Sequence, residues 1–136
     1  MLKYTKNDDL VSSEHSDESF DLSPFLGSWT NTKEGSGQLP LVELRGENGV
    51  LYFRAYGAGK EGLIDWGESE CEVYAENTYD GTAIAFLTSF SFDDMEVKIS
   101  SNVKLGVLVI QTYTIFNDGS NRLNYYAREF YGPTQD

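Results

Sequence analysis

Residues 41–56 read LVELRGENGVLYFRAY, and this stretch decides the fold. Apolar and polar residues alternate on both sides of the polar, glycine-containing segment 46–49, which is the pattern of two antiparallel strands joined by a tight turn. If Arg45 opposes Val50, the apolar side chains fall on one face of the pair, and the register is consistent with itself. That face carries Val42, Leu44, Leu51 and Phe53. The stretch therefore predicts a β-hairpin with one buried face.

Similar short segments continue in both directions, separated by turn residues. The expected strands are 29–32, 41–45, 50–56, 68–73, 83–91, 95–99, 105–116 and 122–131. Their connections are local, and closing such a sheet on itself removes its exposed edges. A sandwich is the other arrangement open to about eight short strands. We therefore expect an all-β, antiparallel, up-and-down barrel of about eight strands over residues 23–136, preceded by a flexible acidic arm over residues 1–22.

Composition limits the functions open to the chain. Its 136 residues suit one domain, and its formal net charge of −12 disfavours binding to nucleic acid or to anionic membranes. The single cysteine, Cys71, excludes an internal disulfide, and the single histidine, His15, lies in the arm. We therefore expect no metal site, no cofactor and no catalysis built on histidine. No apolar run resembles a signal peptide or a membrane span, so the expected location is the cytoplasm.

The last predicted hairpin, over residues 105–131, supplies the first candidate site. Pairing Phe116 with Asn121, and turning Arg128 inward, places a polar set on the inner face: Gln111, Tyr113, Asn124 and Tyr126. The opposite face then carries Leu108, Ile110, Thr112, Tyr125, Ala127 and Glu129, with Tyr131 alongside. Polar groups inside a barrel need partners. They indicate either the wall of a ligand pocket or hydrogen bonding to internal waters and neighbours.

Several short motifs resemble a known superfamily. Gly27-Ser28-Trp29 opens the first predicted strand, and Arg128 lies on the last. This arrangement resembles the calycin superfamily, which includes lipocalins, fatty-acid-binding proteins and avidins. Further motifs resemble a group of short bacterial barrel proteins: Tyr56-Gly57-Ala58, Asp65-Trp66-Gly67, Asp118-Gly119-Ser120, Asn124-Tyr125 and Arg128-Glu129. The resemblance implies a barrel in which Trp29 and Arg128 form a structural closure pair, with the arginine covering the indole.

The glycine-rich stretch 57–66 is expected to be a loop that places Trp66 at the rim of the barrel. Glu68, Glu70 and Glu72 alternate along the next strand. Carboxylates in this arrangement can hold calcium, but alternation on a strand is typical of a solvated face. Cys71 would then point inward as a small buried side chain.

Three functions follow as hypotheses. The first is binding of a small, largely apolar molecule inside the barrel, with this set of ligand-binding residues: Phe53, Trp66, Phe86, Phe90, Gln111, Tyr113, Asn124 and Tyr126. The second is a cofactor-free isomerase or cyclase acting on a small hydrophobic substrate in the cavity, using Arg54, Tyr113 and Tyr126. The third is a homo-oligomeric interaction module without a ligand, and a homodimer through the outward face of the last hairpin is compatible with all three.

Overall fold

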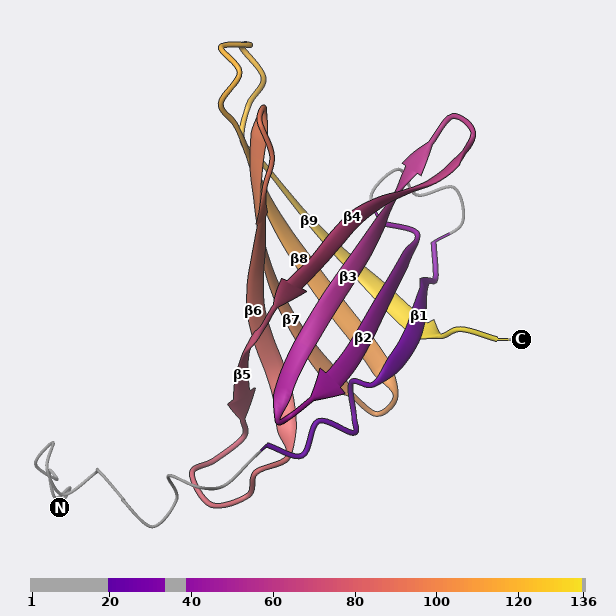
Figure 1. Cartoon of the computed structure of the whole chain (residues 1–136), viewed down its shortest axis with the longest axis vertical. Helices are drawn as coiled ribbons and strands as arrows, with labels where there is room; N and C mark the ends of the chain where they lie inside the picture. The colour runs from indigo at the N-terminus through magenta and orange to yellow at the C-terminus, as the bar shows by residue number, and fades with distance from the viewer. Residues whose placement is uncertain (1–19, 34–38, 136) are drawn as a thin grey trace, which may run out of the picture.

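The computed structural model describes residues 20–33 and 39–135, which form a nearly closed antiparallel barrel (Figure 1). Nine strands follow one another in this part of the chain: β1 (Gly27–Asn31), β2 (Leu41–Glu47), β3 (Val50–Gly59), β4 (Gly62–Glu70), β5 (Glu72–Ala75), β6 (Ala83–Ser91), β7 (Met95–Lys104), β8 (Val107–Phe116) and β9 (Tyr125–Pro133). Their order in the sheet is β4-β3-β2-β1-β9-β8-β7-β6-β5. The expected up-and-down barrel is confirmed, with nine strands where about eight were expected.

The β2–β3 hairpin has the predicted buried face but a different register. Leu44 pairs with Phe53, not with Leu51, because the turn contains two residues and not four. Asn48 and Gly49 both have positive φ angles, of 53° and 79°, as a two-residue hairpin turn of the type I′ requires. A shift of two residues leaves every side chain on its original face, so the predicted core survives the error.

The two edges of the sheet meet along a seam between β4 and β6. β4 and β5 form one bent path: β4 pairs with β3, and after Cys71 the chain changes partner, so that β5 pairs with β6. Side chains bridge the seam. The hydroxyl of Thr88 donates to the carbonyl oxygen of Glu70 at 2.9 Å, and the hydroxyl of Ser69 donates to the carbonyl oxygen of Ser89 at 2.9 Å. Side-chain hydrogen bonds therefore replace a backbone ladder at this point.

One end of the barrel is closed by the segment that precedes β1. Figure 1 shows this segment at the same end as the β2–β3 and β7–β8 turns. Phe25 and Trp29 are buried there, and the indole nitrogen of Trp29 donates to the carbonyl oxygen of Phe25 at 2.8 Å. The ring of Phe25 packs edge-on against Phe86, with 5.2 Å between ring centroids. We call this the closed end.

The closure pair expected between Trp29 and Arg128 is wrong. Trp29 in β1 lies opposite Pro133 of β9, and Arg128 is five residues away along that strand. The guanidinium of Arg128 lies on the outer face instead, 5.2 Å from the ring centroid of Phe130. The carbonyl of Phe25 satisfies the indole, so the tryptophan does not need the arginine.

The expected orientation of the last hairpin is also wrong. Leu108, Ile110 and Thr112 are buried inside the barrel, whereas Tyr113 and Tyr126 are 42% and 52% exposed on the outer face. Burial of the aliphatic positions outweighs the assumption that Arg128 points inward, because apolar area removed from water dominates the choice of face. The register also differs by two residues, since Tyr113 pairs with Tyr126 and not with Asn124.

The predicted division of the chain at residues 22 and 23 falls close to the first described residue. Residues 1–19, which contain most of the predicted arm and His15, lie outside the described residues. Leu22 is buried in the core, and Asp21 forms a bridge with Thr82. Within the described ranges, no helix is long and apolar enough to cross a membrane.

Candidate binding site at the open end of the barrel

A series of aromatic rings runs from the core toward the end of the barrel opposite the closed end. Phe53 lies 5.5 Å from Phe86 and 6.0 Å from Phe90, measured between ring centroids. Phe90 in turn lies 5.7 Å from Trp66 and 6.2 Å from Phe92. Phe53, Phe86 and Phe90 are buried, whereas Trp66 and Phe92 are only partly buried. The series therefore forms an aromatic wall that begins in the core and reaches solvent.

A bulge in β4 places Trp66 in this wall. The register between β3 and β4 shifts between Arg54 and Tyr56, and Gly67 has a φ of 93°, which favours glycine. The carboxylate of Asp65 accepts a hydrogen bond from the amide of Gly67 at 2.8 Å and pairs with Arg54 at 2.6 Å. The stretch expected to be a loop is therefore the end of β3, a two-residue turn at 60–61 and the start of β4.

Gly57 gives Trp66 its space. A Cβ atom at Gly57 would lie 2.7 Å from the indole nitrogen of Trp66, closer than side chains approach one another. The motifs Tyr56-Gly57-Ala58 and Asp65-Trp66-Gly67 are therefore parts of one structural unit. Gly57 in the first motif has no side chain, and the indole of Trp66 in the second motif occupies the space that a side chain at position 57 would take.

The wall opposite the aromatic rings comes from β8 and β9. Residues directly opposite in an antiparallel pair share a face, so Ala127 points inward with Thr112, and Glu129 points inward with Ile110. Ala127 and Glu129 are only partly buried even though they face the interior. Phe116, Met95 and Tyr125, farther along the same inner face, are also partly exposed. Thr114 and Val97, which lie one step farther toward this end than Thr112, are still buried, so only the last inward residues of β7 and β8 reach solvent. We call this end the open end.

Thr112 stands out within the inner wall. The residue is 4% exposed, and its hydroxyl oxygen has no hydrogen-bond partner. Its neighbours across the sheet are Ile99 and Ala127, neither of which offers a polar side chain. By contrast, the buried hydroxyl of Ser101 donates to the carbonyl oxygen of Val109 at 2.7 Å. A buried hydroxyl without a partner costs about 1–3 kcal/mol, so its presence requires a reason.

The eight ligand-binding residues expected from the sequence separate into two groups. Phe53, Trp66, Phe86 and Phe90 come together in the aromatic wall. Gln111, Tyr113, Asn124 and Tyr126 do not join them: Asn124 is exposed in the β8–β9 connection, and the other three lie on the outer face, where the Tyr126 hydroxyl donates to the Gln111 side chain at 2.8 Å. The sequence interpretation missed Thr112 as an inner residue, although its spacing of two from Ile110 was the available signal.

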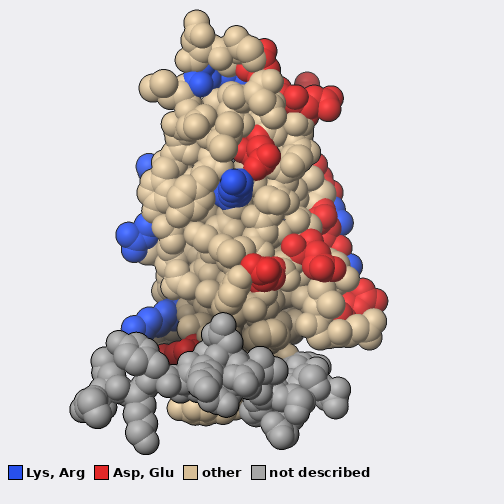
Figure 2. All heavy atoms as spheres, turned by 90° about the vertical axis from the view of Figure 1, so that its left-hand side faces the viewer, with Lys and Arg blue, Asp and Glu red and all other residues tan. Residues whose placement is uncertain are grey.

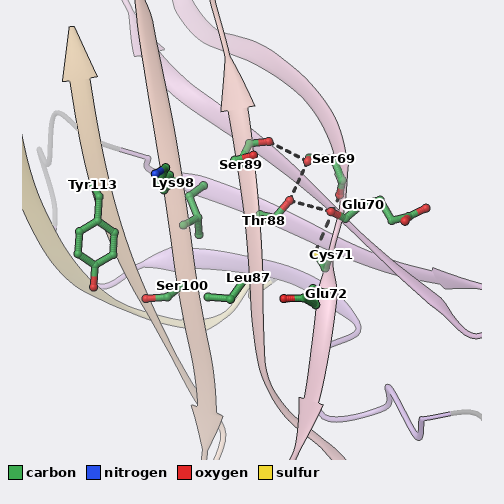
Figure 3. A pocket seen from close by; sticks show the side chains of 11 residues that line it. Ser69, Glu70, Cys71, Glu72, Leu87, Thr88, Ser89, Lys98, Ser100 and Tyr113 are labelled. Atoms are coloured by element: carbon green, nitrogen blue, oxygen red, sulfur yellow. Dashed lines mark hydrogen bonds between the residues drawn. The ribbon is translucent and has the colours of Figure 1, made fainter.

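A hollow of about 760 Å³ lies on the outside of the barrel beside the seam (Figure 3). Its lining comes from β4 to β8 and includes Ser69, Glu70, Cys71, Glu72, Leu87, Ser89, Lys98, Ser100 and Tyr113. Figure 2 shows this side of the molecule, where most atoms are uncharged, basic and acidic side chains interrupt the middle of the face, and carboxylates gather along the right-hand edge. Glu70 and Glu72 are exposed there, as their alternation predicted.

Cys71 in this hollow has the character of a core residue. Burial raises the pKa of its thiol to about 12, so the nucleophilic thiolate is scarce at neutral pH. The cysteine thus contributes packing, as expected from its alternation with glutamates. Across the described part of the chain, no group of three or more His, Cys, Asp and Glu side chains is placed to hold a metal ion.

The fold and the site together define a class: an antiparallel up-and-down barrel with one closed end, one open end and an inner wall that is aromatic on one side and partly polar on the other. No protein-family model, no curated protein and no solved structure matches the chain. The function must therefore be argued from the residues themselves.

Proposed function

We propose that this protein binds a small, largely apolar molecule inside the open end of the barrel. The observation that carries the proposal is the hydroxyl of Thr112, which is buried on the inner wall without a hydrogen-bond partner. A polar atom of a ligand would satisfy it. The apolar part of the ligand would pack against Trp66, Phe90 and Phe92. One hydrogen-bonding group facing an aromatic wall is the usual composition of a small-molecule site.

The shape of the barrel supports this proposal. The last inward residues at the open end are partly exposed, which gives a ligand a place to enter. The side chains of Thr114 and Val97, which are buried between that end and Thr112, would have to move for the ligand to reach the hydroxyl. Barrels of about this strand number hold one small ligand. As part of the same proposal, we place the chain with calycin-like barrels, and we place its activity in the cytoplasm, where a free cysteine such as Cys71 is common.

The proposal is tested with N-phenyl-1-naphthylamine, an uncharged probe whose fluorescence rises in apolar surroundings. The purified protein should bind the probe saturably, with one site per chain. Ala127→Phe, which fills the inner wall beside Thr112, should abolish binding. Ala85→Phe makes the same change in β6 on the face that bears Asn102 and not the core, and it should leave binding intact.

The outcomes separate the site from the outer hollow. Loss of binding in both variants, with an unchanged near-UV circular dichroism spectrum, would show that the probe does not report on the open end. Binding that survives Ala127→Phe would contradict the proposal. The homodimer expected through the last hairpin stays a prediction, and the residues available for it are now Tyr113, Tyr126 and Phe130 on the outer face.

A further inference from the structure

The outer surface of strands β5 to β9 differs on the two sides of β7. On the β5 side lies the hollow, which opens between Tyr113 and the carboxylate side chains of Glu70 and Glu72 (Figure 3). On the β9 side, the rings of Tyr113, Tyr126 and Phe130 project outward, and each residue is at least 42% exposed. We call these three rings the aromatic ridge. A depression thus flanks β7 on one side, and a ridge flanks it on the other.

One row of outward side chains crosses this surface from edge to edge. In the register of the sheet, Arg128 pairs with Gln111, Gln111 with Ser100, Ser100 with Leu87, and Leu87 with Glu72. The row therefore begins with a guanidinium on β9, ends with a carboxylate on β5 and has Ser100 of β7 at its centre. Figure 2 shows the same polarity over the whole face, with basic side chains along the left-hand edge and carboxylates along the right-hand edge.

This arrangement is complementary to itself. A second copy, related by a half-turn about an axis parallel to β7, exchanges the two sides of the face. The aromatic ridge of each copy then lies over the hollow of the other, and Arg128 of each lies on the side of Glu72 of the other. A half-turn about an axis across the strands would place like charges together instead. Charge and shape therefore favour the same axis.

The charged groups at the two edges are available for contacts between copies. Arg45, Arg54 and Arg122 each pair with a carboxylate of their own chain, whereas the exposed guanidinium of Arg128 lies over the Phe130 ring, 5.2 Å from its centroid. At the other edge, the exposed Glu72 accepts a hydrogen bond from the Tyr74 hydroxyl through one carboxylate oxygen, which leaves the second oxygen for a guanidinium.

Lys98 is the charged side chain nearest the axis, because it lies on β7 two residues from Ser100. The half-turn would bring it beside its own counterpart. The carboxylate of Glu96 lies 4.0 Å from the Lys98 ammonium in the same copy, so the two lysines bring counter-charges with them. Both residues are exposed enough to stay hydrated at a mutual distance.

The face is large enough for a stable pair. Strands β6, β7 and β8 contain 9, 10 and 10 residues. Five strands of this kind cover roughly 20 Å by 30 Å, since strands lie about 4.8 Å apart and rise about 3.3 Å per residue. Side-chain relief adds to this area, which then approaches the about 800 Å² that each partner buries in a standard interface.

We infer that the outer face of β5 to β9 is the interface of a homodimer whose two-fold axis runs parallel to β7 through Ser100. The interface takes in the aromatic ridge of the last hairpin and joins it to the hollow and the carboxylates on the far side of β7. It lies on the side of the barrel, so the open end stays accessible in the dimer. The inference is therefore independent of the proposed ligand.

The experiment is sedimentation equilibrium of the full chain, with exchange of the two edge charges. At about 100 µM the mass should be that of two chains, and dilution should dissociate the pair. Arg128→Glu and Glu72→Arg should each raise the dimer Kd at least about tenfold, because the axis makes one substitution alter two contacts. The double variant should restore the Kd to within about threefold of the wild type. Lys60→Glu makes the same charge reversal in the β3–β4 turn and should leave the Kd unchanged.

The outcomes separate this interface from others. A monomer at every concentration would overturn the inference. A dimer that neither single reversal weakens, or that the double variant does not restore, would place the contact on another surface. A mass that keeps growing with concentration would indicate head-to-tail association and would overturn the two-fold axis. Ser100→Arg, which puts two like charges at the axis, should give a monomer with an unchanged near-UV circular dichroism spectrum, and a stable dimer of this variant would contradict the position of the axis.

Discussion

Thr112→Val should stabilise the ligand-free protein while weakening its binding of 1-decanol, a small apolar alcohol that would compete with N-phenyl-1-naphthylamine at the open end. The hydroxyl is buried at 4% exposure without a partner, and valine keeps nearly the same shape without a polar atom. Relieving an unsatisfied buried hydroxyl returns about 1–3 kcal/mol to the folded state. We take about 1 kcal/mol as the expected gain, which corresponds to a rise in Tm of roughly 3–5 °C for a domain of this size. Loss of one hydrogen bond to the alcohol should weaken its binding about fivefold.

The assay is urea unfolding without ligand, followed by decanol competition on the same samples. Ser101→Ala is the matched control, because its buried hydroxyl has a partner, the carbonyl oxygen of Val109 at 2.7 Å. That variant should lose about 1 kcal/mol of unfolding free energy and keep its affinity for decanol. A Thr112→Val protein that is less stable than the wild type, with unchanged decanol binding, would refute the reasoning.

Three further predictions concern the scaffold. Gly57→Ala should destabilise the protein by about 1–3 kcal/mol in urea unfolding, because its Cβ would lie 2.7 Å from the Trp66 indole; Gly132→Ala, where nothing lies within 4 Å, should change stability little. Thr88→Val removes the hydroxyl that bonds across the seam, and faster amide exchange in β5 should follow, whereas unchanged exchange would show that the bridge is dispensable. Cys71 should react with a thiol reagent far more slowly at pH 8 in the folded protein than in 6 M urea, since burial raises its thiol pKa to about 12; equal rates would contradict its burial.

The barrel could be predicted from the sequence because alternation with a period of two determines the face of each strand. Val42, Leu44, Leu51 and Phe53 are buried as expected even though the hairpin register moved by two residues. An even shift conserves faces, so the prediction of the core tolerated an error in the turn.

The candidate site was harder to predict because it depended on one assumption about orientation. Turning Arg128 inward to cover Trp29 inverted the whole last hairpin, and Gln111, Tyr113 and Tyr126 went to the wrong side with it. The alternating Leu108 and Ile110 carried the opposite signal, which is the stronger one, since burial of aliphatic side chains decides the face of a strand.

The stretch 57–66 shows a second limit. Its glycines indicated a loop, but Gly59 and Gly62 flank the tight turn of a long hairpin, and Gly57 makes room for a close contact. The role of Gly57 depends on Trp66, which packs against it from the neighbouring strand. This contact cannot be read from the sequence around Gly57 alone. The unpartnered hydroxyl of Thr112 likewise becomes evident only when all its neighbours are placed.

The most direct measurement of the central claim is an NMR titration of the full chain with N-phenyl-1-naphthylamine, followed through the two tryptophan indole signals and the Thr112 methyl group. Trp66 lies at the open end, whereas the indole of Trp29 is hydrogen-bonded at the closed end and serves as an internal reference. We expect the signals of Trp66 and Thr112 to shift together and to saturate, while the signal of Trp29 stays in place. Shifts confined to Leu87 and Tyr113 in the outer hollow, or no shift at Thr112, would contradict binding inside the barrel.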